Sequence, residues 1–305
     1  MKIVILGAGA MGSLYGGFLA EGGNEVWLLD VWKEHMDTIN KNGLKIEGLS
    51  GDRIIRNIKA TTNPSEIGIA DLVIVFVKST ITDMAISQNL DIFNADTIVL
   101  TLQNGLGNVE KINKSIDEKN IIPGVTAHGA TLIGPGSIRH AGIGATHIGE
   151  LDGNSSDRIQ NMANILNLAG LDTSISDNVM GLIWGKLLVN VGINAITAIT
   201  KLKNGQLLDH AETEELLEKA VDEAWTIVKA KEISLSYDNP IIHTKQVCKA
   251  TAQNFSSMLQ DITNSRKTEI DMINGAIVRE GSILGIETPI NIVLTNLIKA
   301  LENNY

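Results

Sequence analysis

Cysteine is almost absent from the chain, because its 305 residues contain only Cys248. A lone cysteine cannot close an intrachain disulfide and cannot supply a cysteine-based metal cluster, a pattern typical of proteins in a reducing cytoplasm. We therefore expect a cytoplasmic protein with no metal site, in which Cys248 packs in the core.

Basic residues are also in short supply. The chain has 25 Lys and Arg against 35 Asp and Glu, which gives a net charge of −10 and a pI near 5.1. A nucleic acid or an anionic membrane would need concentrated positive charge, so we expect neither as a partner.

Long hydrophobic runs are missing as well. Uncharged residues 121–138 include two prolines and four glycines, residues 187–200 include two asparagines, and the N-terminal apolar run stops at Gly7. None of these segments is typical of a membrane span or a signal peptide. With 44% hydrophobic residues and a mean hydropathy of +0.10, the composition is that of a globular protein long enough for two domains.

The motif Gly7-x-Gly9-x-x-Gly12 is the strongest local signal. It follows an apolar run at residues 3–6, opens a helical pattern over residues 13–20, and precedes a second β-rich run at residues 25–29. In such a unit the first glycine makes the turn, the second admits a pyrophosphate, and the third lets helix and strand pack closely. The motif predicts a dinucleotide site formed by Gly7, Gly9, Ala10, Met11 and Gly12.

An acid, Asp30, ends the second β-rich run. A carboxylate there can accept hydrogen bonds from the adenosine ribose hydroxyls and would repel a 2′-phosphate, so Asp30 favours NADH over NADPH. Two alternatives stay open, since Asp30 could instead cap the helical segment 31–40 and Lys33 could attract a phosphate.

The two halves of the chain follow different patterns. Residues 1–176 alternate short β-rich runs with helical patterns, which predicts a Rossmann-type parallel sheet with helical crossovers. Within them, residues 71–77 and 97–102 are continuous apolar runs typical of strands buried on both faces, and residues 121–150 indicate strands and hairpins. From residue 177 to 305, long helical patterns, including one from 240 to 285, predict a helical second domain.

Lys78 and Asn104 follow the two apolar strands. Ligands of open α/β sheets bind at the carboxyl ends of strands, so both residues are candidates for cofactor binding. A solvated lysine and a turn asparagine are the alternatives. His128, His140 and His147 lie nearby in the chain, but no carboxylate pattern selects one of them as a catalyst.

Lys186, Asn190 and Asn194 interrupt an otherwise apolar segment, residues 182–197. On a helix with about 3.6 residues per turn, the four-residue spacing aligns all three along one side. An uncompensated buried polar group costs about 1–3 kcal/mol, so we expect this polar stripe to face a polar cleft. A solvent-facing strip on a half-buried helix is the alternative.

Residues 252–275 offer possible partners for the stripe. If this segment is helical throughout, Asn254, Ser257, Asp261 and Glu269 fall near one line along the helix. A lysine, several amides, a hydroxyl and an acid could together enclose a small, oxygen-rich substrate.

Over nearly its whole length the chain resembles the ketopantoate reductase family. The resemblance rests on the glycine motif, Lys78, Asn104-Gly-Leu-Gly107, residues 182–198, and Ser256-Ser-Met-Leu-Gln-Asp with Thr268-Glu-Ile-Asp-Met-Ile-Asn-Gly. It implies an α/β fold with an N-terminal Rossmann-type doubly wound sheet, followed by an all-helical domain like that of 6-phosphogluconate dehydrogenase. The dinucleotide domain would span residues 1–176, and the substrate and catalytic domain residues 177–305.

The resemblance also implies an activity, the NAD(P)H-dependent reduction of 2-dehydropantoate (ketopantoate) to (R)-pantoate on the route to pantothenate and coenzyme A. Lys186 would be the general acid that protonates the alkoxide formed by hydride addition, which an ammonium group also stabilises. Glu269 would be a site acid contacting substrate or cofactor. The implied substrate-binding residues are Asn104, Asn190, Asn194, Asn254 and Ser257.

One position departs from the family pattern. Members that use NADPH commonly carry an arginine near the end of the second strand, where this chain has Asp30. We keep two alternative functions, a reductase of another branched 2-oxo acid and a dinucleotide-binding sensor without turnover. The apolar helical half is compatible with a homodimer.

Overall fold

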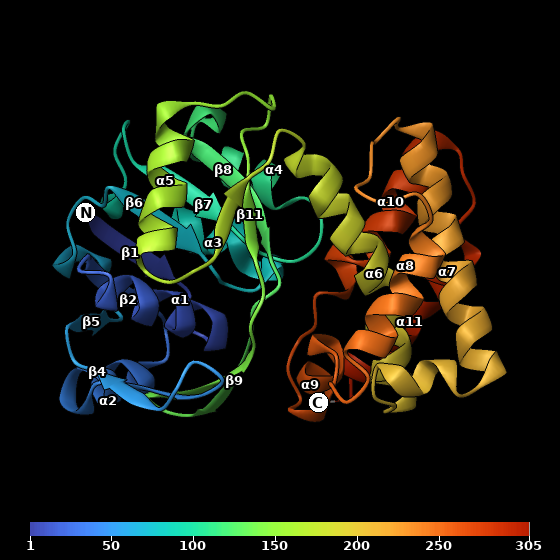
Figure 1. The fold of residues 1–305 in the computed structure, drawn as a ribbon, viewed down its shortest axis with the longest axis horizontal. Helices are drawn as coiled ribbons and strands as arrows, with labels where there is room; N and C mark the ends of the chain where they lie inside the picture. The colour runs from blue at the N-terminus through green and yellow to red at the C-terminus, as the bar shows by residue number, and fades with distance from the viewer. Residues whose placement is uncertain (305) are drawn as a thin grey trace. The chain divides into compact units, whose positions relative to one another are not determined.

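The computed structural model describes residues 1–304, which form two compact units coloured from blue to green and from yellow to red in Figure 1. Unit 1 comprises residues 1–103 and 108–179, and unit 2 comprises residues 104–107 and those from 180 onward. The chain therefore passes between the units three times. The last passage lies close to the boundary expected after residue 176, whereas no pattern in the sequence indicates that residues 104–107 belong with the helices.

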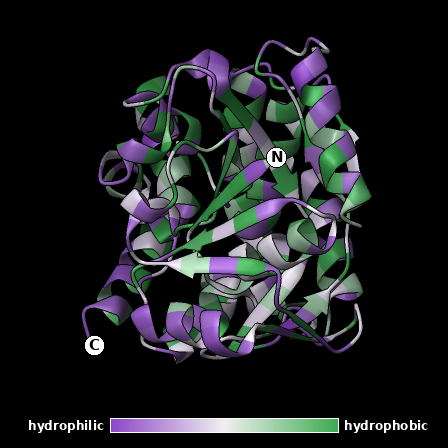
Figure 2. Cartoon of the chain, turned by 90° about the vertical axis from the view of Figure 1, so that its left-hand side faces the viewer, coloured by the Kyte–Doolittle hydropathy of each residue, from purple (hydrophilic) through white to green (hydrophobic). Residues whose placement is uncertain are grey.

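Unit 1 is built on an eight-stranded sheet. Its strands are, in spatial order, β12 (Thr173–Ile175), β11 (Thr146–Ile148), β8 (Ile121–Thr126), β7 (Ile98–Thr101), β6 (Leu72–Val75), β1 (Lys2–Leu6), β2 (Glu25–Leu29) and β5 (Ile58–Thr61). Every neighbouring pair is parallel except β8 and β11. All four residues of β6 are buried, as expected of an inner strand covered on both faces, and the strands are mostly green in the hydropathy colouring of Figure 2.

A second sheet of four strands belongs to the same unit. It consists of β4 (Arg53–Ile55), β3 (Leu44–Gly48), β10 (Ser137–Gly142) and β9 (Gly129–Gly134), in that spatial order. The strands β8 to β11 confirm the strands and hairpins expected in residues 121–150, whereas β3, β4 and the second sheet itself were not expected.

Helix α1 (Ala10–Glu21) lies between the two sheets, since it contacts β1 and β2 on one side and β3, β9 and β10 on the other. Gly16 faces the large sheet, where an added Cβ would lie 2.6 Å from Leu28 Cδ2. Gly17 faces the second sheet, where an added Cβ would lie 2.7 Å from Ile46 Cδ1. The two glycines therefore let both sheets approach the helix backbone.

The remaining helices of unit 1 are short. They are α2 (Lys33–Asn42), α3 (Thr82–Ser87), α4 (Asn108–Asn113) and α5 (Asp157–Leu168), with single 3-10 turns η1 (Pro64–Glu66), η2 (Ser79–Ile81), η3 (Leu90–Ile92) and η4 (Glu118–Asn120).

Unit 2 is helical, as expected. Its elements are α6 (Val179–Thr200), α7 (Ala211–Ala230), α8 (Pro240–Ala250), α9 (Ser257–Thr263), α10 (Asn274–Leu284) and α11 (Pro289–Glu302), with the 3-10 turns η5 (Gly205–Leu208) and η6 (Ile270–Met272). Buried side chains from these helices form one hydrophobic core, which includes Cys248 as expected.

The expectation of a continuous helical region from 240 to 285 is wrong. The region is broken into α8, α9 and α10. Helix α9 starts afresh because the Ser256 hydroxyl caps it, accepting a hydrogen bond from the Leu259 N–H at 3.1 Å. It ends where Ser265 adopts a positive φ of 51°, a conformation that an α-helix cannot include.

By length and composition alone, α6 could cross a membrane. In the structure, 67% of its most apolar 18-residue window is buried inside the protein. Leu187, Leu188 and Val191 are among the α6 side chains in the core of unit 2. This burial is that of a core helix in a globular protein.

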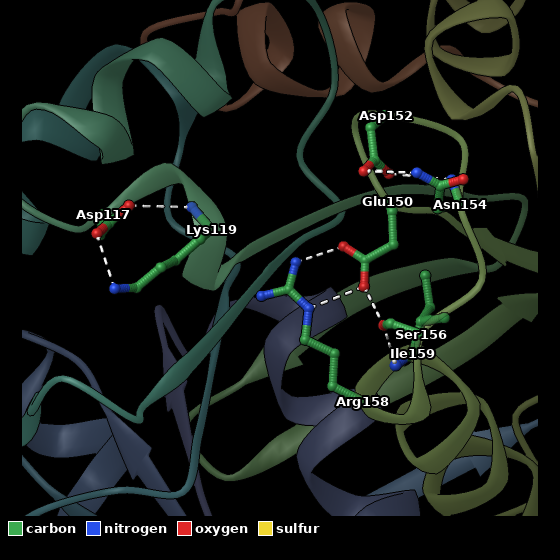
Figure 3. Close-up of polar contacts among 8 residues, drawn as sticks. All are labelled: Asp117, Lys119, Glu150, Asp152, Asn154, Ser156, Arg158 and Ile159. Atoms are coloured by element: carbon green, nitrogen blue, oxygen red, sulfur yellow. Dashed lines mark hydrogen bonds and ion pairs between the residues drawn. The ribbon is translucent and has the colours of Figure 1, made fainter.

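A buried carboxylate holds the connection between β11 and α5 (Figure 3). Glu150 is 6% exposed and accepts a hydrogen bond from Arg158 Nε at 2.8 Å, together with bonds from Arg158 Nη2 and the Ser156 hydroxyl. Ser156 in turn caps α5 by accepting from the Ile159 N–H. The Arg158 guanidinium holds the pKa of Glu150 below its usual range.

Replacing Arg158 by alanine should lower the free energy of unfolding by about 2–4 kcal/mol, because it leaves the Glu150 carboxylate buried without its cation. Lys119→Ala is the matched control, since Lys119 forms an exposed ion pair with Asp117 and should contribute at most about 1 kcal/mol. Urea unfolding measures both. The Arg158 effect should persist above pH 4.5, the ordinary carboxyl pKa, and shrink as lower pH protonates Glu150. Equal effects of the two variants would contradict a special role for this pair.

Candidate active site

The glycine loop between β1 and α1 has the geometry of a diphosphate cradle. Gly7 has a φ of +99°, and a Cβ there would lie 2.5 Å from the Val77 backbone nitrogen. A Cβ at Gly12 would lie 1.9 Å from the Gly7 carbonyl oxygen, so only glycine fits at either position. Gly9, by contrast, is exposed, and nothing lies within 4 Å of its Cβ position.

The open space at the Gly9 Cβ position lies at the N-terminus of α1. Gly9 is the N-cap residue, and neither a capping side chain nor an acidic residue occupies the first turn, which begins with Ala10 and Met11. The first-turn N–H groups and the positive end of the helix dipole are thereby available to an anionic ligand. The residues present fit a pyrophosphate group.

Asp30 follows β2 and holds backbone amides. Its Oδ2 accepts a hydrogen bond from the Ala8 N–H at 2.7 Å, and its Oδ1 accepts one from the Trp32 N–H at 3.0 Å. Helix α2 begins at Lys33 with Trp32 as its N-cap and has no side-chain cap, so Asp30 does not cap that helix. A carboxylate has about four acceptor sites, so two backbone donors leave room for ribose hydroxyls.

The carboxyl ends of the central strands share one edge of the sheet. Leu6 pairs with Leu29 and Val75, and Val75 with Thr101, which places the residues that follow β1, β2, β6 and β7 along that edge. Lys78 lies there, half-buried, at the start of η2. The sheet edge of unit 1 thus gathers the glycine loop, Asp30 and Lys78.

In unit 2, α6 carries the polar stripe. The helix is continuous from 179 to 200, so Lys186, Asn190 and Asn194 do lie along one side of it. Lys186 and Asn190 are half-buried, and Asn194 is 4% exposed.

The pKa of Lys186 depends on its burial and on the charge of Glu269. Burial lowers the pKa of its amine to about 8, and the negative charge of Glu269 opposes that lowering. Glu269 itself is 8% exposed and lies just before η6. Its Oε2 accepts a hydrogen bond from Asn104 Nδ2 at 3.5 Å. Within unit 2, Asn104 is therefore hydrogen-bonded to Glu269, and the charge of Glu269 acts on Lys186.

Residues 104–107 reach this position by docking on η6, which the sequence did not indicate. The Leu106 N–H donates to the Met272 carbonyl at 3.0 Å, and Leu106 packs against the core of unit 2. Gly105 has a φ of +82°, and a Cβ there would lie 2.3 Å from the same carbonyl oxygen. The two glycines that flank Leu106 are compatible with a close backbone approach, but they do not indicate which part of the chain approaches.

The alignment expected for Asn254, Ser257, Asp261 and Glu269 along one helix is wrong. The single helix assumed for residues 252–275 is not formed, so Asn254, Ser257, Asp261 and Glu269 do not share a helix face. Asn254 lies in the connection before α9, Ser257 is the first residue of α9, and both are exposed.

A hydrogen bond that the sequence did not predict anchors this region. The Thr197 hydroxyl, one turn beyond Asn194 on α6, donates to Ser256 Oγ at 2.7 Å. The bond ties Ser256, the residue before Ser257, to α6 about one turn beyond Asn194, through a pair of buried hydroxyls.

His128 and His140 lie together in unit 1. His128 Nδ1 and His140 Nε2 lie 3.1 Å apart within unit 1, and burial lowers the pKa of both. Among residues 1–304, no group of three or more His, Cys, Asp or Glu side chains is placed to hold a metal ion.

Two family models match the chain. The model "Ketopantoate reductase PanE/ApbA" matches residues 3–153, and "Ketopantoate reductase PanE/ApbA C terminal" matches residues 178–302. A 2-dehydropantoate 2-reductase of Pyrococcus horikoshii is 40% identical over 304 residues, which cover 99% of this chain and 98% of the relative.

Solved structures are similar to this chain over its whole length. A PanE/ApbA family ketopantoate reductase from Ralstonia eutropha has a TM-score of 0.92 at 34% identity, covering 100% of this chain and 99% of that one. A D-mandelate dehydrogenase, solved with NADH and anilino(oxo)acetate, has a TM-score of 0.93 at 32% identity with the same coverage.

Glu269→Gln should lower the pKa of Lys186 below its value of about 8, because the substitution removes the negative charge that opposes burial. The pH dependence of Lys186 modification by trinitrobenzenesulfonate, followed by peptide mass spectrometry, measures this pKa. Asp271→Asn is the control, since it removes a charge nearby in the chain that pairs with Lys299 and does not act on Lys186. An unchanged Lys186 pKa in Glu269→Gln would contradict the coupling.

Proposed function

The chain belongs to the ketopantoate reductase family, and from this membership we propose that it is a 2-dehydropantoate 2-reductase. It reduces the keto group of ketopantoate to the hydroxyl of (R)-pantoate with NAD(P)H, in pantothenate and coenzyme A biosynthesis. The observation that carries the proposal is the half-buried Lys186 on the polar stripe of α6, whose pKa responds to the charge of Glu269. We further propose that it works in the cytoplasm on a small 2-oxo acid; a homodimeric state stays a prediction.

The glycine loop and the sheet edge would hold the dinucleotide. Its pyrophosphate fits against Gly9 and the N–H groups of Ala10, Met11 and Gly12, where no side chain caps α1. Lys78 and Asn104, which come after neighbouring strands, would contact the cofactor further along.

NADH is the cofactor that the end of β2 favours. Asp30 puts a negative charge there, Val31 is 92% exposed and apolar, and the exposed Lys33 pairs with Asp37 at 2.9 Å. Nothing in this stretch offers a 2′-phosphate the bidentate cation that binds it well. That a similar protein, a D-mandelate dehydrogenase, was solved with NADH supports the same preference.

Lys186 would act as the general acid. A dinucleotide held at the glycine loop would supply the hydride for the keto carbon, and the carbonyl oxygen of the substrate would then become an alkoxide. An ammonium group within hydrogen-bond reach stabilises that negative charge and gives up one proton to form the hydroxyl. A lysine pKa of about 8 leaves Lys186 mostly protonated at neutral pH and makes it a stronger acid than an exposed lysine.

Amides and a hydroxyl would bind the rest of the substrate. Asn190 and Asn194 lie about one and two helical turns beyond Lys186 on α6, and the Thr197–Ser256 bond ties the residue before Ser257 to the same helix. Such groups can donate to a substrate carboxylate and to its hydroxyl. We assign these three, together with Asn104 and Asn254, to substrate binding, and Glu269 to holding the charge of Lys186 at the site.

Reduction of another branched 2-oxo acid is the second candidate. It is favoured by the similarity to D-mandelate dehydrogenase, whose structure holds a 2-oxo acid analogue, anilino(oxo)acetate. A pocket distinguishes substrates that differ by one methylene by only about 1–3 kcal/mol, so the family fold admits both substrates. A sensor without turnover is less consistent with the site, because binding alone does not require a proton donor such as Lys186.

A steady-state assay with purified protein tests substrate and cofactor together. We expect kcat/KM to be highest with ketopantoate among branched and aromatic 2-oxo acids, and higher with NADH than with NADPH. Val31→Arg should raise kcat/KM for NADPH, since the side chain is exposed and its replacement disturbs no packing. An about tenfold preference of the unaltered protein for NADPH would refute the NADH assignment, and a better 2-oxo acid would favour the second candidate.

Lys186→Ala should lower kcat by about 100-fold or more, the usual contribution of a general acid, while NADH binding stays within about twofold. Lys219→Ala, at an exposed ion pair on α7, should leave kcat unchanged. In the unaltered protein, kcat/KM for reduction should fall as the pH rises through about 8, because Lys186 loses its proton there. Full turnover in Lys186→Ala would remove the lysine from the mechanism.

A further inference from the structure

A buried histidine that the proposed reaction does not use lies beneath the glycine loop. His35, on α2, is 0% exposed and contacts three separate parts of unit 1. Its ring stacks on Trp32, with centroids 4.9 Å apart and planes inclined by 9°. Its Nδ1 accepts a hydrogen bond from the Gly136 N–H at 2.9 Å, and its Nε2 lies 3.2 Å from Ser13 Oγ.

These contacts assign the tautomer of His35. A backbone N–H can only donate, so Nδ1 must carry a lone pair, and the proton of the neutral ring is on Nε2. Nε2–H therefore donates to Ser13 Oγ. The Ser13 hydroxyl in turn donates to the Ala8 carbonyl at 2.9 Å. The result is a one-way chain of donors from Gly136 through His35 and Ser13 to Ala8.

Ala8 is the residue between the first two glycines of the motif, and both of its peptide groups are held. Its carbonyl accepts from Ser13, and its N–H donates to Asp30. Ala8 is 1% exposed, so water does not replace either bond. The orientation of these two peptide groups sets the path of the loop from Gly7 to Gly9, and hence the position of the open surface at Gly9.

We propose that His35 is a positioning residue for the dinucleotide: as the neutral Nε2–H tautomer it fixes Ala8 through Ser13, and the loop keeps its binding shape only while this chain of hydrogen bonds is intact. The proposal rests on the proposed function, since it assumes that the loop binds a dinucleotide. An imidazolium cannot accept from the Gly136 N–H, so a proton on Nδ1 breaks the chain at its origin.

Few charges act on His35. Burial lowers its pKa below the ordinary 6.5, and the negative charge of Asp30, at the end of β2, opposes that lowering. The acids on α2 itself, Glu34 and Asp37, are exposed. From α1, the glycine loop and the turn between β9 and β10, the groups that face the ring are the uncharged Ser13, the Ala8 backbone and Gly136. A hydrogen bond to the Ala8 backbone also opposes the lowering of the pKa, more weakly than Asp30. The neutral ring is therefore the resting form at neutral pH.

The test measures the dissociation constant of ADP-ribose by calorimetry, because this probe carries the pyrophosphate and is stable in acid. At about pH 8, His35→Ala and Ser13→Ala should each weaken binding by about tenfold, the effect expected of one lost buried hydrogen bond. In NADH turnover the same variants should raise KM by a similar factor and leave kcat within about twofold. His140→Gln is the matched control, since His140 is also buried in unit 1 and packs against Phe18 of α1 without a bond to the loop.

A pH profile separates positioning from mere packing. The affinity of the unaltered protein for ADP-ribose should fall as the pH drops below 6.5. His35→Gln, whose amide does not titrate there and can still donate to Ser13, should bind better than His35→Ala and lose the pH dependence. If His35→Ala does not fold, the positioning role is tested by the ADP-ribose affinity of Ser13→Ala and by the pH dependence of ADP-ribose binding to the unaltered protein.

Two outcomes overturn the inference, and they are distinguishable. Affinities of His35→Ala and Ser13→Ala within about twofold of the unaltered protein exclude the role of His35 while leaving the reductase intact. An unaltered protein that binds neither ADP-ribose nor NADH contradicts the proposed function, and the inference falls with it.

Discussion

The burial of α1 between two sheets is the constraint on which the nucleotide-binding half depends. Gly16 and Gly17 let each sheet reach the helix backbone, and Tyr15, which is 0% exposed, donates from its hydroxyl to Thr126 of β8 at 2.8 Å. A helix clamped on both sides cannot shift along its axis without breaking these contacts. Its N-terminus, where a pyrophosphate would bind, is therefore fixed by packing far from the loop itself.

In the helical unit, the main constraint is that a lysine, Lys186, lies half-buried on an otherwise apolar helix. Burial is the larger influence on Lys186, and the charge of Glu269 offsets only part of it. The resulting pKa of about 8 makes the Lys186 ammonium a stronger acid than the ammonium of an exposed lysine. Asn104 connects Glu269 to the segment after β7, so the charge balance of the lysine includes a residue that comes from the Rossmann half of the sequence.

The features that could be predicted from the sequence are those whose signals lie within a few neighbouring residues. The glycine loop and the polar stripe on α6 depend on spacings of two to four residues, which the backbone geometry of turns and helices converts directly into position. The helix expected across residues 252–275 failed because a short-range competitor, the Ser256 cap, starts a new helix. The second sheet and the docking of Leu106 on Met272 join residues remote in the chain, and no local pattern encodes such pairings.

The position of residues 104–107 has a consequence for how such proteins can be recombined in evolution. The family models divide the chain into segments 3–153 and 178–302, yet the folded helical unit also includes four residues from the middle of the first segment. A gene fusion that exchanged only the C-terminal half would combine Leu106 of one parent with the helical core of the other. It would likewise combine residue 104 of one parent with Glu269 of the other. The folded boundary and the family-model boundary therefore differ by residues 104–107, and a chimera has to take these four residues from the same parent as its helical unit.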